Sequence, residues 1–324
     1  MQLDITYKSV LRVIFLLIAI WLLYQVTDVL AVIFFGTIIA SAISPVVDKL
    51  EKERIPRVLG ALLIYILILL LFSFLIYIVV PPTIAQISKL SERLPLLLQN
   101  YLGSLDLPQD VFTQVRESLA NASSNVLGWL FGVLGGVGNV LFVFIISFYL
   151  TVEDEAIKEL FRTALPNHRQ QYIVDLINRS QKTLSQWLKA QLTLMFSIGI
   201  LTFLALFFLN IPHALALGVL AGILEIIPFV GPVIAAVPAI IFALDISPIT
   251  ALITLGLFIA IQQVESQVLT PIVMKRAFEI NPVLVLIALF VGAKLGGIVG
   301  ILASVPLLAL ILEFSKDYYA KTSQ

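Results

Sequence analysis

The chain has 324 residues and contains no cysteine, only two histidines and only 12% charged residues. A chain without cysteine forms no disulfide, no thiolate nucleophile and no cysteine-ligated metal site. Two histidines are too few for a multi-histidine metal cage. The formal net charge is zero, so no general electrostatic attraction to nucleic acid is expected. We therefore expect no metal, no cofactor and no nucleic-acid partner.

Common catalytic motifs are missing as well. The sequence contains no His-Glu-x-x-His zinc motif and no phosphate-binding P-loop. Asp28 and Asp245 stand in apolar surroundings at predicted span ends and lack the glycine motif of an intramembrane protease. These absences indicate that the protein is not an enzyme. They also indicate that any transport is not driven by ATP bound to this chain.

Hydrophobic residues, by contrast, make up 60% of the chain and occur in long blocks, which indicates that lipid is the surrounding solvent. We predict an all-α, polytopic membrane protein with about eight hydrophobic segments: about six full spans plus two re-entrant helical hairpins in an inverted repeat. Pro81 and Pro82 should end the third span, because proline inside a helix loses a hydrogen bond and clashes with the preceding turn. The predicted full spans are residues 13–26, 29–47, 58–80, 126–152, 190–209 and 249–270.

Polar stretches between the spans divide the chain into units. The amphipathic helix expected after residue 81 either packs on its own domain or lies on the membrane surface. A second amphipathic helix should continue directly into the fifth span. In the fourth span Gly128, Gly132 and Gly136 recur at four-residue intervals, which lets another helix pack closely. The predicted units are spans one to three (1–80), an extracytoplasmic insert (81–125), span four (126–152), a cytoplasmic insert (153–189), a transport core (190–315) and a cytoplasmic tail (316–324).

Two apolar segments in the transport core, residues 214–244 and 282–312, are too long for single crossings. A helix of that length would reach about 46 Å, whereas the hydrocarbon core of a bilayer is about 30 Å thick. Both segments are also broken near their middles by residues that stop helices, so we predict that each folds back as a re-entrant hairpin. The breaks are Glu225-Ile226-Ile227-Pro228-Phe229-Val230-Gly231-Pro232 and Lys294-Leu295-Gly296-Gly297.

The second halves of these segments resemble each other. The run from Ile234 to Pro238 (IAAVP) echoes the run from Leu302 to Pro306 (LASVP). Counted back from the two prolines, Glu225 and Lys294 fall at equivalent hairpin tips. Such an inverted repeat with breaks at the membrane midplane is typical of secondary transporters. Because lysine and arginine concentrate on cytoplasmic sides, their distribution predicts that both termini are cytoplasmic.

The hairpin tips carry the candidate chemistry. Irregular backbone at membrane depth must face a cavity or other protein. Pro232 suits the first turn of a second limb, whose free N–H groups would attract an anion or an oxygen lone pair. Glu225 should lie at the end of the first limb, where burial and the helix dipole oppose ionisation, so it could exchange a proton or accept a cation. Alternatively, Glu225 and Lys294 pair and only hold the tips together.

The span before the second hairpin adds further polar side chains. Its amides and carboxyl either line a cavity or form hydrogen bonds between helices. The predicted substrate- or ion-binding residues are Glu225, Pro228, Gly231, Pro232, Gln262, Gln263, Glu265, Gln267, Lys294, Gly296 and Gly297.

Several of these motifs resemble the autoinducer-2 exporter family, also described as PerM-like permeases, over nearly the whole chain. The resemblance rests on Pro45-Val46-Val47-Asp48-Lys49-Leu50, on Phe148-Tyr149-Leu150, on Glu-x-x-Pro-x-x-Gly-Pro at residues 225–232 and on Gly296-Gly297-Ile298-Val299-Gly300. It implies a bacterial or archaeal plasma-membrane protein. Members have been linked to export of the quorum-sensing molecule autoinducer-2, and others look like sodium- or lithium-proton antiporters.

We accordingly expect a multi-pass cell-membrane transporter, surrounded by lipid, that exports a small polar molecule such as autoinducer-2. Sodium(lithium)/proton antiport is the alternative, and a channel or a non-transport scaffold is the second alternative. We also expect a homo-oligomer.

Overall fold

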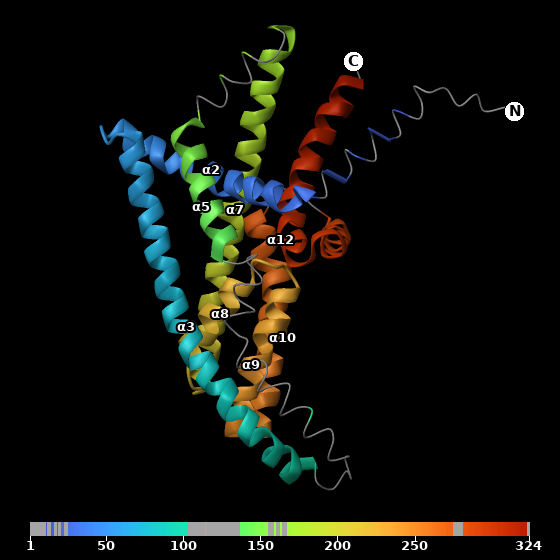
Figure 1. The fold of residues 1–324 in the computed structure, drawn as a ribbon. Coiled ribbons are helices and arrows are strands. Elements are labelled where there is room, and N and C mark those ends of the chain that lie inside the picture. Colours follow the sequence, from blue (N-terminus) through green and yellow to red (C-terminus); the bar gives the residue numbers. More distant parts are fainter. Residues whose placement is uncertain are drawn as a thin grey trace, which may run out of the picture.

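The computed structural model describes residues 25–102, 137–154, 167–274 and 281–322, together with isolated residues elsewhere. Every regular element in this part of the chain is helical, and Figure 1 shows how the helices are arranged. The elements are α2 (Thr27–Lys52), α3 (Arg57–Leu102), α5 (Val137–Val152), α7 (Asn167–Phe208), α8 (Ala214–Leu224), α9 (Val230–Ile246), α10 (Pro248–Val264), the π-helix η2 (Glu265–Leu269), α11 (Thr270–Met274) and α12 (Pro282–Thr322).

Five helical stretches are long and apolar enough to cross a membrane. They are Val29–Lys52, Arg57–Ile78, Gln170–Phe208, Pro248–Met274 and Pro282–Ser315. The chain is therefore an all-α, multi-pass membrane protein, as predicted. The predicted first span, residues 13–26, lies largely outside the described residues. The same holds for Gly128, Gly132 and Gly136 of the fourth span, of which the structure describes α5.

The prediction that Pro81 and Pro82 end the helix of the third span is wrong, although the part of this helix that is apolar enough to cross a membrane, Arg57–Ile78, lies close to the predicted span of residues 58–80. Helix α3 runs for 46 residues and continues through both prolines to Leu102. Figure 1 shows that α3 bends in its lower part, and proline bends a helix without ending it when the flanking turns hold. The predicted insert thus begins as an extension of the third span. The apolar face predicted for residues 84–101 lies outside the described side chains, and most of 103–125 lies outside the described residues.

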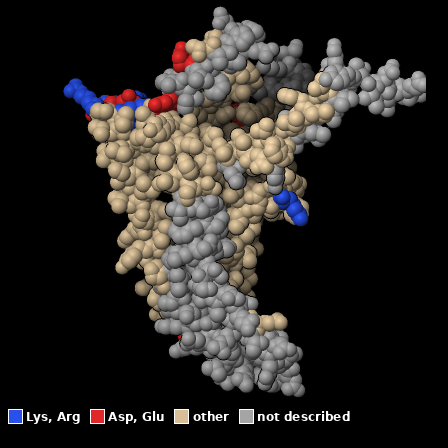
Figure 2. All heavy atoms as spheres, in the orientation of Figure 1, with Lys and Arg blue, Asp and Glu red and all other residues tan. Residues whose placement is uncertain are grey.

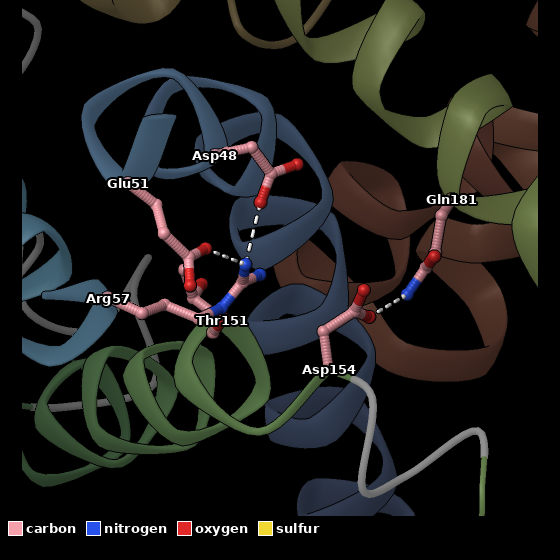
Figure 3. Close-up of polar contacts among 6 residues, drawn as sticks. All are labelled: Asp48, Glu51, Arg57, Thr151, Asp154 and Gln181. Atoms are coloured by element: carbon pink, nitrogen blue, oxygen red, sulfur yellow. Dashed lines mark hydrogen bonds and ion pairs between the residues drawn. The ribbon is translucent and has the colours of Figure 1, made fainter. Parts of the chain in front are cut away.

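A single guanidinium ties α2, α3 and α5 together (Figure 3). Arg57 Nη1 donates to Asp48 Oδ1 at 2.7 Å and to Glu51 Oε2 at 3.0 Å, while Nε donates to the carbonyl oxygen of Thr151 at 2.9 Å. The contact satisfies a carbonyl at the end of α5, where no further helical turn supplies a donor. We call these four residues the Arg57 clamp.

Helix α7 confirms that the predicted second insert continues into the fifth span, because it runs for 42 residues without interruption. Helix α8 packs against it through glycine. A Cβ at Gly218 would lie 2.8 Å from the carbonyl oxygen of Gly199, and one at Gly222 would lie 2.7 Å from that of Met195. The Gly-x-x-x-Gly spacing on α8 thus allows the two backbones to touch.

The first broken segment is a helical hairpin. Helix α8 has 11 residues and α9 has 17, so they are about 16 Å and 26 Å long, and neither reaches across a 30 Å hydrocarbon core. Between them Phe229 adopts φ 67°, ψ −41°. A Cβ at Gly231 would overlap the carbonyl of Leu224, so the last turn of α8 and the first turn of α9 meet backbone to backbone.

The second broken segment also folds back. The backbone of α12 leaves the helical conformation at Gly296 (φ −138°) and Gly297 (φ 56°). On either side of this break, Gly292 and Gly300 touch, since a Cβ on either would overlap the carbonyl of the other. The two limbs of α12 therefore approach each other closely. The predicted break positions are confirmed, whereas the placement of both hairpins in a membrane stays a prediction.

The two hairpins match in backbone detail. Phe229 lies nine residues before Pro238 and Gly297 lies nine residues before Pro306, and both have positive φ. The carbonyls that meet the opposite limb belong to Leu224 and Gly292, each fourteen residues before its proline. This equivalence of conformation supports the repeat that the sequence indicated.

The surface divides into an apolar body and a charged end. Figure 2 shows that most of the visible Lys, Arg, Asp and Glu side chains gather near the end of the molecule where α2 meets α3. Below this end, large apolar side chains are exposed on the helices, among them Leu67 and Tyr77 of α3, Phe196 and Phe208 of α7 and Leu252 of α10. Such a surface is suited to lipid.

Candidate functional site

Glu225 lies at the break of the first hairpin. It is the residue at which α8 ends, and its side chain is buried, with 1% of the residue exposed. The helix ends here because Pro228 disfavours helical backbone before it, and the amides of Ile226 and Ile227 form shorter-range bonds to Ile223 and Leu224. The tight turn fixes Glu225 with its side chain directed into the protein.

Glu265 lies opposite Glu225. It begins the π-helix η2 inside the span Pro248–Met274, and only 6% of it is exposed. Its carboxyl group lies close to that of Glu225. Two ionised carboxylates are acceptors only, so these two groups can share a hydrogen bond only when one of them carries a proton. A π-turn inside an α-helix is frequent at functional sites, and here it presents the glutamate to the hairpin.

Two glutamines complete the contacts of this carboxyl pair. Gln262 Nε2 donates to Glu265 Oε2 at 3.1 Å, one turn away on α10. Gln191 of α7 is 1% exposed, and its Nε2 donates to the backbone carbonyl of Glu225 at 2.6 Å. Within the described part of the chain, Glu225 Oε2 and Gln191 Oε1 have no hydrogen-bond partner. Buried acceptors of this kind favour a proton or a small cation.

The other predicted residues of the first hairpin and the span lie around this pair. Gly231 and Pro232 are buried in the first turn of α9, as predicted for Pro232, and Pro228 is half-buried. Gln263 and Gln267 lie on the exposed side of the span, where Gln267 Nε2 donates to Gln263 Oε1 at 3.1 Å. The structure thus divides the amides of this span, and only Gln262 reaches the carboxyl pair.

The second hairpin does not reach Glu225. Lys294, Gly296 and Gly297 are exposed at its tip. The ion pairs found among the described residues do not include one between Glu225 and Lys294. The partner of Glu225 is Glu265, so the alternative in which Lys294 neutralises the buried glutamate does not describe this structure.

Sequence reasoning missed Gln191. The available signal was an amide at the beginning of an otherwise apolar span, a position where a polar side chain must find a partner inside the protein. It also missed the close packing at Gly218 and Gly222, although a Gly-x-x-x-Gly spacing identifies them. Among the described residues, no group of three or more His, Cys, Asp or Glu is arranged to hold a metal ion.

The buried carboxyl pair within a broken membrane helix can be compared with known families. A family model described as "AI-2E family transporter" matches residues 11–320. The chain belongs to the AI-2E family of membrane transporters. The resemblance indicated by the sequence motifs is thereby confirmed, and membership of a transporter family agrees with the expectation that the protein is not an enzyme.

Relatives of this AI-2E transporter come from several bacteria. "Putative transport protein YrrI" of Bacillus subtilis (strain 168) is 28% identical over 302 residues, covering 87% of this chain and 86% of the relative. "Putative transport protein YueF" of the same organism is 28% identical over 340 aligned residues, covering 94% and 91%. "Putative transport protein YhhT" of Escherichia coli (strain K12) is 24% identical over 295 residues, covering 88% and 83%.

Proposed function

We propose that the protein is a proton-coupled secondary transporter that exports a small polar solute such as autoinducer-2 from the cell. The observation that carries the proposal is the buried contact between Glu225 and Glu265 at a break in the membrane helices. The pair carries the coupling proton, and the family membership supports autoinducer-2 as the class of solute. The surrounding partner is the lipid bilayer, and the protein works as a homo-oligomer in the cell membrane.

When the pair loses its proton, the attraction between the two carboxyl groups is replaced by repulsion. With one proton the two carboxyls are held together by a hydrogen bond. Without it, two like charges about 4 Å apart repel by about 4 kcal/mol at an effective dielectric constant of about 20. That energy shifts a two-state equilibrium by about a thousandfold, which is enough to move a hairpin tip between two positions. The π-turn at Glu265 and the irregular backbone at residues 225–229 are the segments that can change shape.

A polar line along α7 supplies the surroundings for a hydrated solute. Trp187 Nε1, Gln191 Oε1 and Thr202 Oγ1 are buried, and each has no hydrogen-bond partner among the described residues. Their spacing places them near one face of α7. Buried polar atoms of this kind pair with water or ligand. The amides of Gln263 and Gln267 are further solute contacts, and Lys294 lies at the second tip.

The topology that we propose has six full spans, two re-entrant hairpins and both termini in the cytoplasm. The short α8 supports it, since it ends in the middle of the bilayer if it begins at an interface. Single cysteines can be placed freely in a cysteine-free chain. An impermeant thiol reagent should label residues 85–120 only from outside and residues 160–185 only from inside. Labelling of residue 245 from the cytoplasm would contradict the first hairpin.

Sodium(lithium)/proton antiport is the second candidate function. The specific observation in its favour is that Glu225 Oε2 and Gln191 Oε1 are buried and have no hydrogen-bond donor among the described residues, while Gln191 Nε2 contacts the backbone carbonyl of Glu225. Oxygen acceptors without hydrogen are the ligands that alkali cations require. In this alternative the cation itself exchanges with the proton on the carboxyl pair, and no organic solute moves.

Flux measurements on reconstituted protein separate the two functions. Vesicles loaded with autoinducer-2 should lose it faster under an inward proton gradient. Glu225→Gln keeps the size of the side chain and removes its titration, so the gradient should no longer accelerate the loss. Glu153→Gln changes an exposed carboxylate away from the pair and serves as the control. Sodium-driven proton movement without solute loss would establish antiport instead, and normal gradient dependence in Glu225→Gln would remove the pair from the mechanism.

A further inference from the structure

The outer face of the span Pro248–Met274 is polar at a depth where it should meet lipid. Gln263 and Gln267 are both exposed on this span, and Gln267 Nε2 donates to Gln263 Oε1 at 3.1 Å. Gln263 lies fifteen residues after Pro248, which is about 22 Å along the helix, so a hydrocarbon core of about 30 Å that begins at Pro248 encloses it. Lipid tails form no hydrogen bonds, so amides exposed at this depth require another partner.

The hydrogen bond between the two glutamines leaves most of their polar atoms unused. A glutamine amide has two N–H donors and a carbonyl oxygen that can accept twice. The bond uses one donor of Gln267 and one acceptor position of Gln263, and within the described part of the chain neither amide group has a further hydrogen-bond partner. Donors and acceptors therefore both remain on this surface. The group that matches such a set of donors and acceptors is another amide.

The same face has the spacing and the small residues that let a helix approach closely. Its positions follow one another at alternating steps of four and three residues, the spacing of a seam along which two helices pack. We call them the amide face, and all are exposed: Ile249, Ile253, Gly256, Ala260, Gln263 and Gln267. A Cβ on Gly256 would meet nothing within 4 Å. Small residues four apart bring α8 against the backbone of α7, whereas the pair on α10, Gly256 and Ala260, is exposed.

We propose that a second copy of this chain covers the amide face, with α10 of one protomer packed along α10 of the other. All copies enter the membrane in one orientation, so the two helices run parallel, and a two-fold axis along the membrane normal places the two copies of Gln263 opposite each other. Nε2 of each Gln263 donates to Oε1 of the other, and this oxygen still accepts the N–H of Gln267. The inference rests on the proposed homo-oligomer and names its contact surface. One N–H of each Gln263 and Oε1 of each Gln267 stay available to a solute.

Disulfide formation between single cysteines tests where the two copies meet. The chain has no cysteine of its own. Ala260→Cys places a thiol on the amide face, and Leu255→Cys places one at an exposed position about 140° around the same helix. Mild oxidation of the full-length protein, diluted in phosphatidylethanolamine–phosphatidylglycerol vesicles, should convert Ala260→Cys to covalent dimers and leave Leu255→Cys as single chains. No dimer in Ala260→Cys, or an equal or higher yield in Leu255→Cys, would overturn the proposal.

Energy transfer between fluorescently labelled copies in the same vesicles measures how tightly the two copies associate. Gln263→Leu removes the amide contact and should weaken association about tenfold, whereas Val264→Leu changes the neighbouring exposed residue and should not. Gly256→Phe should block the close approach and abolish association, whereas Leu255→Phe adds a ring away from the amide face and should not. Gly256→Ala keeps a small residue and should still associate.

The association assay separates this inference from the proposed function, because association at equilibrium requires no transport. Unchanged association in folded Gln263→Leu or Gly256→Phe would overturn the amide face as the contact surface, even if the protein forms an oligomer through another surface. Single copies that still lose solute under a proton gradient would refute this inference and leave the transport function intact. Association through the amide face without any solute flux would support the inference and refute that function.

Discussion

Replacing Gly231 by alanine should push apart the two helices of the first hairpin, α8 and α9. In the structure a Cβ at this position would overlap the carbonyl of Leu224 and lie 3.0 Å from the amide nitrogen of Glu225. These are backbone atoms, which cannot turn away as the end of a flexible side chain can. The strain must move α9 away from α8, and with it the carboxyl of Glu225 away from Glu265.

The expected magnitude follows from two opposing effects. Overpacking of a close contact costs about 1–3 kcal/mol, while glycine to alanine within a helix gains up to about 1 kcal/mol. Gly256→Ala in α10 is the matched control, because a Cβ there meets nothing within 4 Å. The gain in helix propensity is common to both variants. Gly231→Ala should therefore be less stable than Gly256→Ala by the overpacking term alone, about 1–3 kcal/mol.

Titration of the purified variants with sodium dodecyl sulfate, followed by circular dichroism, measures this difference. Proton-driven solute loss from vesicles should also fall in Gly231→Ala and stay at the wild-type level in Gly256→Ala. If the two variants are equally stable and equally active, the backbone contact between α8 and α9 does not exist in the membrane. The account of how Glu225 is positioned would then be refuted.

Three further substitutions test single contacts by the same titration. Arg57→Lys keeps the charge but loses the planar fork that reaches Thr151, and it should destabilise the protein by about 1–3 kcal/mol; wild-type stability would show that the Arg57 clamp does not hold the helices. Gln191→Leu leaves the carbonyl of Glu225 without a donor and should cost about 1–3 kcal/mol, so an unchanged midpoint would contradict that hydrogen bond. Phe229→Gly relieves a positive φ at an exposed ring and should stabilise the protein by up to about 1 kcal/mol; lower stability than the wild type would contradict this account of the turn.

The sequence allowed the helical class, the break positions and the continuous α7 to be predicted because each depends on local chemistry. Apolar length determines which helices can span a bilayer. Proline and glycine determine where backbone can leave the helix, which is why the breaks at Pro228 and at Gly296 were found. The prediction that the helix of the third span ends at Pro81 and Pro82 used the same rule and was wrong. Proline imposes a local cost of about 3 kcal/mol, and the flanking turns of α3 outweigh it.

The partner of Glu225 could not be predicted, because it depends on packing between distant segments. Charge alone suggested Lys294, which occupies the equivalent position in the second hairpin. The actual contact requires α10 to lie beside the hairpin and a π-turn to direct Glu265 inward. Neither feature leaves a periodic signal in the sequence. Gln191 was missed for a related reason, since its role depends on reaching a carbonyl 34 residues away in the chain.

The repeat and the carboxyl pair together indicate how the two hairpins divide their roles. Both tips have a residue with positive φ, Phe229 or Gly297, nine residues before the proline of the second limb. Their backbones can therefore change shape in the same way. Their charged residues meet opposite surroundings, because Glu225 is 1% exposed whereas Lys294 is exposed. A buried acid exchanges its proton only when a path to water opens. We infer that the first hairpin holds the coupling proton, and that the irregular backbone at residues 225–229 and the π-turn at Glu265 are the segments that move when the proton leaves.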